Sequence, residues 1–509
     1  MKHFSRIQEL LKQNEGIFLI LVFAFFLRIP SLFEPYWHGD EGIYLTLGMA
    51  MRKGLVFYSQ IHDNKPPLLY LLAGISATQF WFRFILLWWN LAGIYIFYLL
   101  AGNIFEKKKT ALISTLLFTL LTATQEGNIP NAEIFMILPT TLAMFFIYKT
   151  INNQQSIISN KKYYFLAGIL FSVALLFKVP GGFSFAAAIC FLLFIQDLKI
   201  GLLPKKIKKF LIHNSNFIIL IFSFIILPLI SIIYYWLQGA GPQYLKAAFF
   251  QNIGYLSSWG GEWNKPLVSS SSELSQRGFC LLLILFVLFL LRKHLSKAFL
   301  LVILWFFFDL FAALLSGRPY QHYLIQLIPS LSLLVFFLFT QKRYIQKIIT
   351  VASLLILAFS FFHYNFQTYP FIKYYKNYLS FAAKQKSRQD YFSFFDSRVS
   401  QTYELVKIIK TFSNEDDYIF IWGNEPYLYA LSDRLPAGRY TTDYHIIDFN
   451  GWEETLKSID QNKPELIVKI KSEKSFPTLE ERISTGYRKI ATLDAAEVFK
   501  RRNIVKYGQ

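Results

Sequence analysis

One polar stretch begins with Tyr36-Trp37-His38-Gly39-Asp40-Glu41 and ends with Asn64-Lys65-Pro66-Pro67. The chain around it consists mostly of Leu, Ile and Phe. The stretch follows the first strongly apolar run and holds two adjacent carboxylates, two histidines and a lysine next to two prolines. Charged groups in apolar surroundings are costly, so they usually have a purpose. We therefore interpret the stretch as the first exterior loop of a multi-span membrane protein.

The composition supports this interpretation. Of the 509 residues, 54% are hydrophobic and 18% are aromatic, whereas soluble globular proteins contain roughly 45–50% apolar residues. The net charge of +20 comes from short basic clusters between apolar runs, where membrane topology places them, so it does not indicate nucleic-acid binding. Cys190 and Cys280 both fall in apolar runs and predict neither a disulfide framework nor a metal site.

The apolar runs predict about eleven transmembrane helices, because a bilayer takes about 20 residues of helix to cross. These runs lie near 10–30, 79–101, 110–125, 132–150, 163–179, 183–197, 212–237, 278–291, 298–316, 323–340 and 348–366.

Basic clusters alternate with connections that lack them. The clusters are Lys107-Lys108-Lys109, Lys161-Lys162, Lys205-Lys206 with Lys208-Lys209, Arg292-Lys293 and Lys342-Arg343. By the positive-inside rule, these connections are cytoplasmic, as is the amino terminus with Lys2 and Arg6. The first polar loop, the 125–131 turn, the 238–277 loop, the 317–322 loop and the tail then face outward.

We predict two domains. Residues 1–368 form a polytopic α-helical transmembrane domain whose catalytic first exterior loop spans 31–78, and residues 369–509 form a small soluble extracytoplasmic α/β domain. Within the loop, apolar residues recur at helical spacing from Ile43 to Met51 and predict a helix lying on the membrane surface. Gly54 would end this helix.

The tail reads as alternating strands and helices. Its β-like runs are 418–422 and 466–470, and its helix-like runs are 402–411, 426–432 and 452–460. Such an order is typical of α/β domains. The turn Gly423-Asn424-Glu425-Pro426 follows a strand, where open α/β sheets often bind ligands. An ordinary strand-to-helix connection with a proline at the helix start explains it better.

The first loop supplies candidate residues of both charges. Asp40 and Glu41 could act as a general base or bind a metal; the alternative is a pair of solvated acids at a helix start. Lys65 precedes two prolines that stiffen the backbone, so it could hold a phosphate, or it could be a snorkelling lysine. His62 and Asp63 could contact a sugar or be ordinary polar loop residues.

Later connections place further candidates on the same predicted side. Glu133 begins the fourth apolar run and Lys178 ends the fifth, although a helix-start acid and a snorkelling lysine explain them as well. Asp309 is an intramembrane acid, and such acids are functional candidates by default. In Gly317-Arg318-Pro319-Tyr320-Gln321-His322-Tyr323, Arg318 could clamp a phosphate with His322 donating to it; an interfacial belt is the alternative.

Carboxylates and cations on one face together suit transfer of a group from an anionic lipid. The carboxylates would handle the acceptor hydroxyl, and the cations would stabilise the departing phosphate.

The same residues resemble the superfamily of dolichyl-phosphate-mannose protein mannosyltransferases and lipid A aminoarabinose transferases, glycosyltransferase family 39 with the GT-C fold, in its bacterial form. The resemblance covers roughly residues 15–340. It rests on Asp40-Glu41, Lys65-Pro66-Pro67, Glu133 and the 317–323 segment in that order.

The resemblance implies an inverting transferase of the plasma membrane that moves a sugar from a polyprenyl-phosphate donor to a hydroxyl acceptor at the outer face. It implies that Asp40 is central to catalysis and that Lys65 binds the donor phosphate. The complete predicted site has the catalytic residues Asp40, Glu41 and Glu133 and the substrate-binding residues Asp63, Lys65, Lys178, Arg318, His322 and Tyr323.

Members of this fold differ in their use of a divalent metal. We expect no required cofactor, with Asp40 and Glu133 as the ligands if a metal binds.

Two other classes of function stay open at this point. A transporter or flippase of a lipid-linked sugar would place its polar site near the bilayer midplane, often between internal repeats, whereas most candidates here lie at one face. A non-catalytic scaffold would tolerate replacement of Asp40 and Lys65 together.

Overall fold

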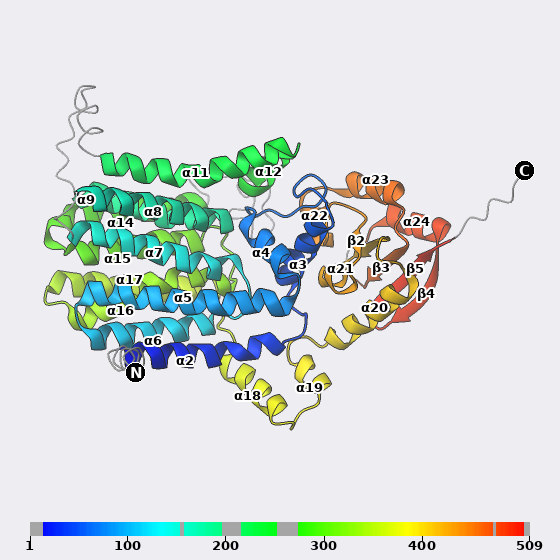
Figure 1. Cartoon of the computed structure of the whole chain (residues 1–509), viewed down its shortest axis with the longest axis horizontal. Coiled ribbons are helices and arrows are strands. Elements are labelled where there is room, and N and C mark those ends of the chain that lie inside the picture. Colours follow the sequence, from blue (N-terminus) through cyan, green and yellow to red (C-terminus); the bar gives the residue numbers. More distant parts are fainter. Residues whose placement is uncertain (1–13, 153–156, 196–214, 252–272, 472–474, 503–509) are drawn as a thin grey trace, which may run out of the picture.

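The computed structural model describes residues 14–152, 157–195, 215–251, 273–471 and 475–502. A bundle of long helices forms one part of the molecule, and a part built around a β-sheet adjoins one end of the bundle (Figure 1). Some predictions fall outside the described residues. These are the amino-terminal cations Lys2 and Arg6, the basic cluster at 205–209, and residues 252–272 of the 238–277 loop.

The bundle consists of helices that correspond one to one with the predicted apolar runs. They are α2 (Glu15–Arg28), α5 (Gln79–Phe105), α6 (Lys108–Thr124), α7 (Ala132–Asn152), α8 (Ile157–Phe177), α9 (Gly182–Ile195), α11 (Ser215–Leu237), α14 (Glu273–Leu291), α15 (Lys297–Ala313), α16 (Ile328–Thr340) and α17 (Tyr344–His363). Short helical segments join them: η2 (Val179–Gly181), α12 (Gly241–Leu245), η3 (Lys246–Phe250), η4 (Arg292–His294) and η5 (Gln321–Leu327).

Seven of the described helical segments are long and apolar enough to cross a membrane. They contain α2, α5, α7, α11, α14, α16 with η5, and α17. The other four predicted spans correspond to α6, α8, α9 and α15, which lie within the same bundle (Figure 1). The α15 helix is buried on nearly every face, with Trp305 fully enclosed, so the bundle has its apolar core around α15.

The basic connections lie at the end of the bundle far from the sheet. The α5–α6 connection with Lys107, the α14–α15 connection with Arg292 and the α16–α17 connection with Lys342 all occur there (Figure 1). The opposite ends of α7, α15 and α16 lead toward the sheet-containing part. The bundle therefore separates a basic end from an end that carries the polar candidates.

The first polar loop folds into η1 (Ile29–Phe33), α3 (Gly39–Arg52) and α4 (Leu68–Ser76). The predicted helix over 43–51 is present in α3, but it is enclosed by protein where the periodicity predicted one exposed face. All residues from Glu41 to Ala50 are buried, because the carboxyl-terminal part covers the face that the periodicity assigned to solvent. Thr46 donates a hydrogen bond of 2.7 Å to the Pro426 carbonyl.

Two close contacts fix α3 in this position. On one side, a Cβ at Gly48 would lie 2.5 Å from the Gly74 nitrogen of α4, and on the other, a Cβ at Gly42 would lie 2.9 Å from the Tyr427 ring. Such distances leave no room for a side chain. Glycine at both positions therefore lets α3 fit between α4 and α21 (Tyr427–Ser432).

A buried charge network braces the start of the loop. Arg83 of α5 contacts the Glu41 carboxylate at 2.5 Å and the Glu34 carboxylate at 2.7 Å, and Tyr374 donates to the other Glu34 oxygen at 2.6 Å. Burial of unpaired charges would be strongly unfavourable. The network ties α3 and the preceding turn to the bundle.

The carboxyl-terminal part contains a five-stranded sheet with the strand order β2-β1-β3-β5-β4. The strands are β1 (Tyr418–Trp422), β2 (Leu435–Pro436), β3 (Leu466–Ile470), β4 (Tyr487–Leu493) and β5 (Ala496–Arg501). β2, β1 and β3 are parallel, while β5 runs antiparallel to both β3 and β4. The helices α20 (Val399–Phe412), α21, α22 (Asp443–Asp448), α23 (Trp452–Asn462) and α24 (Pro477–Gly486) accompany the sheet. Before them in the chain, α18 (Phe371–Ala382) and α19 (Arg388–Ser393) lie near α2, away from the sheet (Figure 1).

Both faces of the central strands are covered. Ile419 and Ile421 of β1 pack against α20 and α21, whereas Phe420 and Trp422 pack against α23 and α24. β1 and β3 have the bounds of the two predicted β-like runs, since strands buried on both faces read as short, continuous apolar runs. Charged residues interrupt the apolar pattern within β4 and β5, and these two strands were not predicted.

Candidate active site

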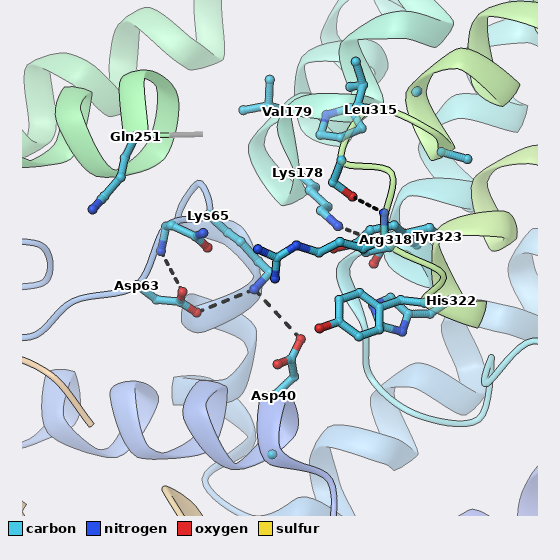
Figure 2. A pocket seen from close by; sticks show the side chains of 18 of the residues that line it. Asp40, Asp63, Lys65, Lys178, Val179, Gln251, Leu315, Arg318, His322 and Tyr323 are labelled. Atoms are coloured by element: carbon cyan, nitrogen blue, oxygen red, sulfur yellow. Dashed lines mark hydrogen bonds and ion pairs between the residues drawn. The ribbon is translucent and has the colours of Figure 1, made fainter. Parts of the chain in front are cut away.

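A cavity of about 1330 Å³ lies where the bundle, the first loop and the carboxyl-terminal part meet. The predicted residues that line it are Asp40, Asp63, Lys65, Glu133, Lys178, Arg318, His322 and Tyr323. They come from α3, the segment before α4, α7, the α8–η2 junction and the α15–η5 connection. Figure 2 shows Asp40, Lys65 and Arg318 directed into the same space.

Asp40 occupies the first turn of α3 beside Lys65. The Lys65 Nζ lies 4.0 Å from Asp40 Oδ2 and 3.7 Å from Asp63 Oδ2, and Tyr44 donates to Asp40 Oδ2 at 3.1 Å. The ammonium also lies 5.2 Å from the centre of the Tyr44 ring. One cation is thus shared by two carboxylates at the cavity wall.

Asp63 is the fixed member of this group. It is buried, and its two oxygens accept hydrogen bonds from the Tyr70 hydroxyl at 2.6 Å and from the Asn64 amide at 2.7 Å. The Tyr58 hydroxyl donates a hydrogen bond of 2.9 Å to the Lys65 carbonyl, and Lys65 is followed by two prolines. These contacts position the Lys65 ammonium in front of Asp40.

The environment keeps both carboxyl groups ionised. Burial raises the pKa of Asp40, but Lys65 and His38 offset this and hold that pKa well below its usual range. The pKa of Asp63 is also lowered, since Lys65 and His445 outweigh the effect of its burial. Asp40 therefore faces the cavity as an anion at neutral pH.

The bundle side of the cavity carries a second acid–base pair. Lys178 donates to Glu133 Oε1, and its ammonium lies 4.0 Å from the centre of the Tyr323 ring. Glu133 begins α7, while Lys178 follows α8 and Tyr323 lies in η5. Three separate segments thus hold the Lys178 ammonium in one place.

The 317–323 segment forms the rest of this wall. Its Arg318 side chain points across the cavity toward Lys65 (Figure 2). His322 Nδ1 lies 3.0 Å from Glu126 Oε2, and the Tyr320 ring stacks on the imidazole at 5.6 Å. Burial raises the pKa of Glu126, but the contact with His322 lowers it by more. The net shift of this pKa is therefore downward.

The carboxyl-terminal part supplies a wall that the candidate residues did not include. Tyr444, His445 and Asp448 of α22 line the cavity, as does Asn424. His445 Nε2 lies 3.7 Å from Asp63 Oδ1, and burial lowers the pKa of this histidine although Asp63 raises it. The turn at 423–426 was the one sequence signal for this wall, and nothing in the sequence pairs α22 with Asp63.

Glycine at position 423 makes the Asn424 placement attainable. Its φ is +145°, and a Cβ there would lie 2.5 Å from Ile470 Cβ. The turn after β1 therefore reaches the cavity by a backbone conformation that other residues rarely adopt.

Glu41 does not belong to the cavity lining, in contrast to its predicted catalytic role. Its carboxylate points away from Asp40 and is fully occupied by Arg83 and Gln79. Adjacent residues on a helix point about 100° apart, so Asp40 and Glu41 could not both face one space. In the structure, Glu41 braces α3.

Asp309 lies behind the cavity. Its Oδ1 accepts hydrogen bonds from Ser184 at 2.8 Å and Gln326 at 3.0 Å. Gln326 itself lines the cavity. Asp309 therefore supports a cavity residue from within the bundle.

The donor groups do not fit a divalent metal ion. Asp40 faces Lys65 and Glu133 faces Lys178, so a lysine occupies the position next to each predicted ligand. Among the described residues, no group of three or more His, Cys, Asp or Glu side chains could hold a metal. A divalent ion usually takes several oxygen ligands, and these two acids do not provide them.

Comparisons with known proteins address the fold and the family. Residues 63–240 match the family model described as dolichyl-phosphate-mannose-protein mannosyltransferase, PMT. This segment is similar to that family. It contains Asp63, Lys65, Glu133 and Lys178, and the match supports a glycosyltransferase over a transporter or flippase.

Solved structures show the same fold at low identity. ArnT from Cupriavidus metallidurans bound to undecaprenyl phosphate has a TM-score of 0.58 at 12% identity, covering 97% of this chain and 99% of that one. The apo form of ArnT has a TM-score of 0.55 at 13% identity, covering 96% and 98%. The predicted multi-span GT-C fold with a small carboxyl-terminal domain is confirmed. No curated protein matches the chain by sequence.

Proposed function

We propose that this PMT-family glycosyltransferase moves a sugar from a polyprenyl-phosphate donor to a hydroxyl acceptor, with inversion at the anomeric carbon. The observation that carries the proposal is the Asp40 carboxylate beside Lys65, with Arg318 directed at them across the cavity. The family match and the undecaprenyl phosphate bound by ArnT support a lipid-phosphate donor.

The reaction requires a base at the acceptor hydroxyl and positive charge at the departing phosphate. Asp40 accepts the proton of the acceptor hydroxyl while that oxygen forms a bond to the anomeric carbon. The bond between this carbon and the phosphate oxygen breaks, and polyprenyl phosphate leaves with the electron pair. Because the carbon is attacked opposite the leaving group, its configuration inverts.

The leaving phosphate gains one negative charge as the bond breaks. Lys65 and Arg318 offset this negative charge, and Lys178 contributes further positive charge from the opposite wall. Cations that meet charge developing in the transition state accelerate the reaction more than they strengthen donor binding. His322 and Tyr323 position the donor phosphate and the acceptor.

The low pKa of Asp40 affects when the proton moves. A weak base does not deprotonate a free hydroxyl, but it accepts the proton once the oxygen has begun to bond to carbon and has become acidic. Glu133 is the second acid of the site, held by Lys178, and it accepts a hydrogen bond from a sugar hydroxyl.

The chain lies in the plasma membrane with the cavity outside and the basic connections inside. The basic end of the bundle supports this orientation. The acceptor is a hydroxyl of a lipid, glycan or protein.

Substitution of Asp40 by Asn tests the proposal. Asn is close to Asp in size but cannot accept the proton, so transfer should fall about 10³-fold while donor binding persists. The assay is release of polyprenyl phosphate from a panel of polyprenyl-phosphate sugars by the purified protein. The exposed Asp390→Asn variant is the matched control. Near-normal turnover of Asp40→Asn would contradict the proposed base.

A further inference from the structure

A second hollow of about 660 Å³ lies between α18 and the bundle, on the side of α2. Its bundle wall consists of Phe23 and Leu27 of α2 and Leu120 of α6, all from the last turns or near the ends of these helices. Its other wall is α18, which lies beside α2 in Figure 1. Among the described residues that line it, Lys376 carries the only charge.

One face of α18 forms the groove wall, and its apolar residues are exposed. The lining residues of α18 recur at helical spacing from Phe371 to Ser380. Ile372 is 80% exposed and Leu379 is 62% exposed. Apolar side chains exposed together on a helix are unfavourable in water and typical of contact with lipid.

The position of α18 is set by specific contacts. The Tyr375 hydroxyl donates to the Leu27 carbonyl at the end of α2, and Tyr374 joins the buried Glu34–Arg83 pair. The groove is therefore a fixed feature between helix ends that emerge from the bundle on the cavity side.

The α18 region carries basic residues on the side of the membrane where the positive-inside rule predicts few of them. Five cations and no acid occur between 371 and 389: Lys373, Lys376, Lys384, Lys386 and Arg388. All five are exposed. Basic residues normally accumulate at the other side of the membrane, where this chain has its basic connections. A basic cluster on the cavity side therefore indicates an anionic partner at the level of the headgroups.

We propose that the groove between α18 and the ends of α2 and α6 binds an anionic phospholipid. An acyl chain lies along Leu27, Leu120 and Leu379, and the headgroup phosphate contacts Lys373 and Lys376. The lipid is separate from the sugar donor, because the groove and the catalytic cavity share no lining residue.

Native mass spectrometry of the full chain in a neutral detergent tests the site. The protein is mixed with phosphatidylglycerol or with phosphatidylcholine, and the retained lipid is counted. The K373Q/K376Q variant removes both proposed phosphate contacts. The matched control is K407Q/K410Q, which removes two exposed lysines of the same spacing from α20.

The wild type and K407Q/K410Q should retain phosphatidylglycerol in preference to phosphatidylcholine. K373Q/K376Q should retain about tenfold less phosphatidylglycerol with an unchanged unfolding temperature. A Leu379→Gln variant, which leaves the charge intact, should also bind less. Equal retention by K373Q/K376Q and the wild type would overturn the proposal. So would equal binding of phosphatidylcholine.

Discussion

Lys65 keeps Asp40 ionised at the cavity wall. Their 4.0 Å separation places an ammonium next to the proposed base, where it holds the pKa of that carboxyl below its usual range. The same ammonium is available to a donor phosphate. Lys65 therefore acts on both sides of the reaction, and the two effects can be measured separately.

Substitution of Lys65 by Gln should change the pH dependence of transfer. Without the cation, burial raises the pKa of Asp40 against only the smaller effects of His38, His322 and Tyr44. The carboxylate is needed for transfer and is lost as pH falls through that pKa, so the acid limb of kcat/KM should move to higher pH. The donor KM should also rise about tenfold, as expected for loss of a hydrogen bond to a charged group.

The control for this experiment is Lys53→Gln, a lysine at the end of α3 that pairs with Asp433. Its acid limb should coincide with that of the wild type. An unshifted limb in Lys65→Gln would contradict the proposed coupling.

Transfer should not depend on a divalent metal, since a lysine stands next to each of the two acids that would bind it. Activity of the purified protein should be unchanged by EDTA and by added Mg²⁺ or Mn²⁺. Loss of activity in EDTA with recovery on adding one of these ions would show that the lysines do not replace a metal.

The sequence placed most of this site for a physical reason. Charge is rare in apolar surroundings, so Asp40, Lys65 and Arg318 stood out, and the topology put them on one side. It could not predict partners joined only by folding. Glu126 beside His322 and His445 beside Asp63 each connect segments that are distant along the chain.

At the scale of elements, α3 is held by the buried Glu41–Arg83 contact. Replacing Glu41 with Gln leaves the Arg83 charge incompletely paired inside the protein, and breaking such a pair costs about 3–5 kcal/mol. We expect a clearly lower unfolding temperature in detergent, measured by the intrinsic fluorescence of the tryptophans.

Asp40→Asn is the comparison for this prediction, because it changes the neighbouring residue without disturbing the pair. It should unfold near the wild-type temperature while losing transfer. Full stability of Glu41→Gln together with lost transfer would return Glu41 to a direct catalytic role.

The helices of the bundle and strands β1 and β3 were predictable because long or continuous apolar runs identify buried elements locally. The complete burial of α3 was not predictable in this way. Its alternation of apolar and small residues is that of a half-buried helix, and only α21, far away in the chain, converts it to a fully buried one. β4 and β5 were missed for the same reason, since neighbouring strands define them more than their own residues do.

At the scale of the whole molecule, the proposed orientation predicts which parts meet the exterior. A cysteine at Asp494, exposed in the sheet part, should react with a membrane-impermeant thiol reagent on intact cells. A cysteine at Lys107, exposed at the basic end of the bundle, should react only after the membrane is opened. Both are introduced with Cys190 and Cys280 replaced by Ala. The reverse labelling pattern would invert the topology.

The enclosure of α3 also means that this helix is synthesised long before the segment that covers it. Thr46 and its partner Pro426 are separated by 380 residues. A ribosome adding about 5–20 residues per second needs roughly 20–80 s to cover that distance. During this time the face of α3 that α21 later covers stays uncovered, and the cavity is incomplete even after the last of the bundle cations, Arg318, has been added. A chain that stops before α21 therefore lacks the wall that covers α3 and should be inactive.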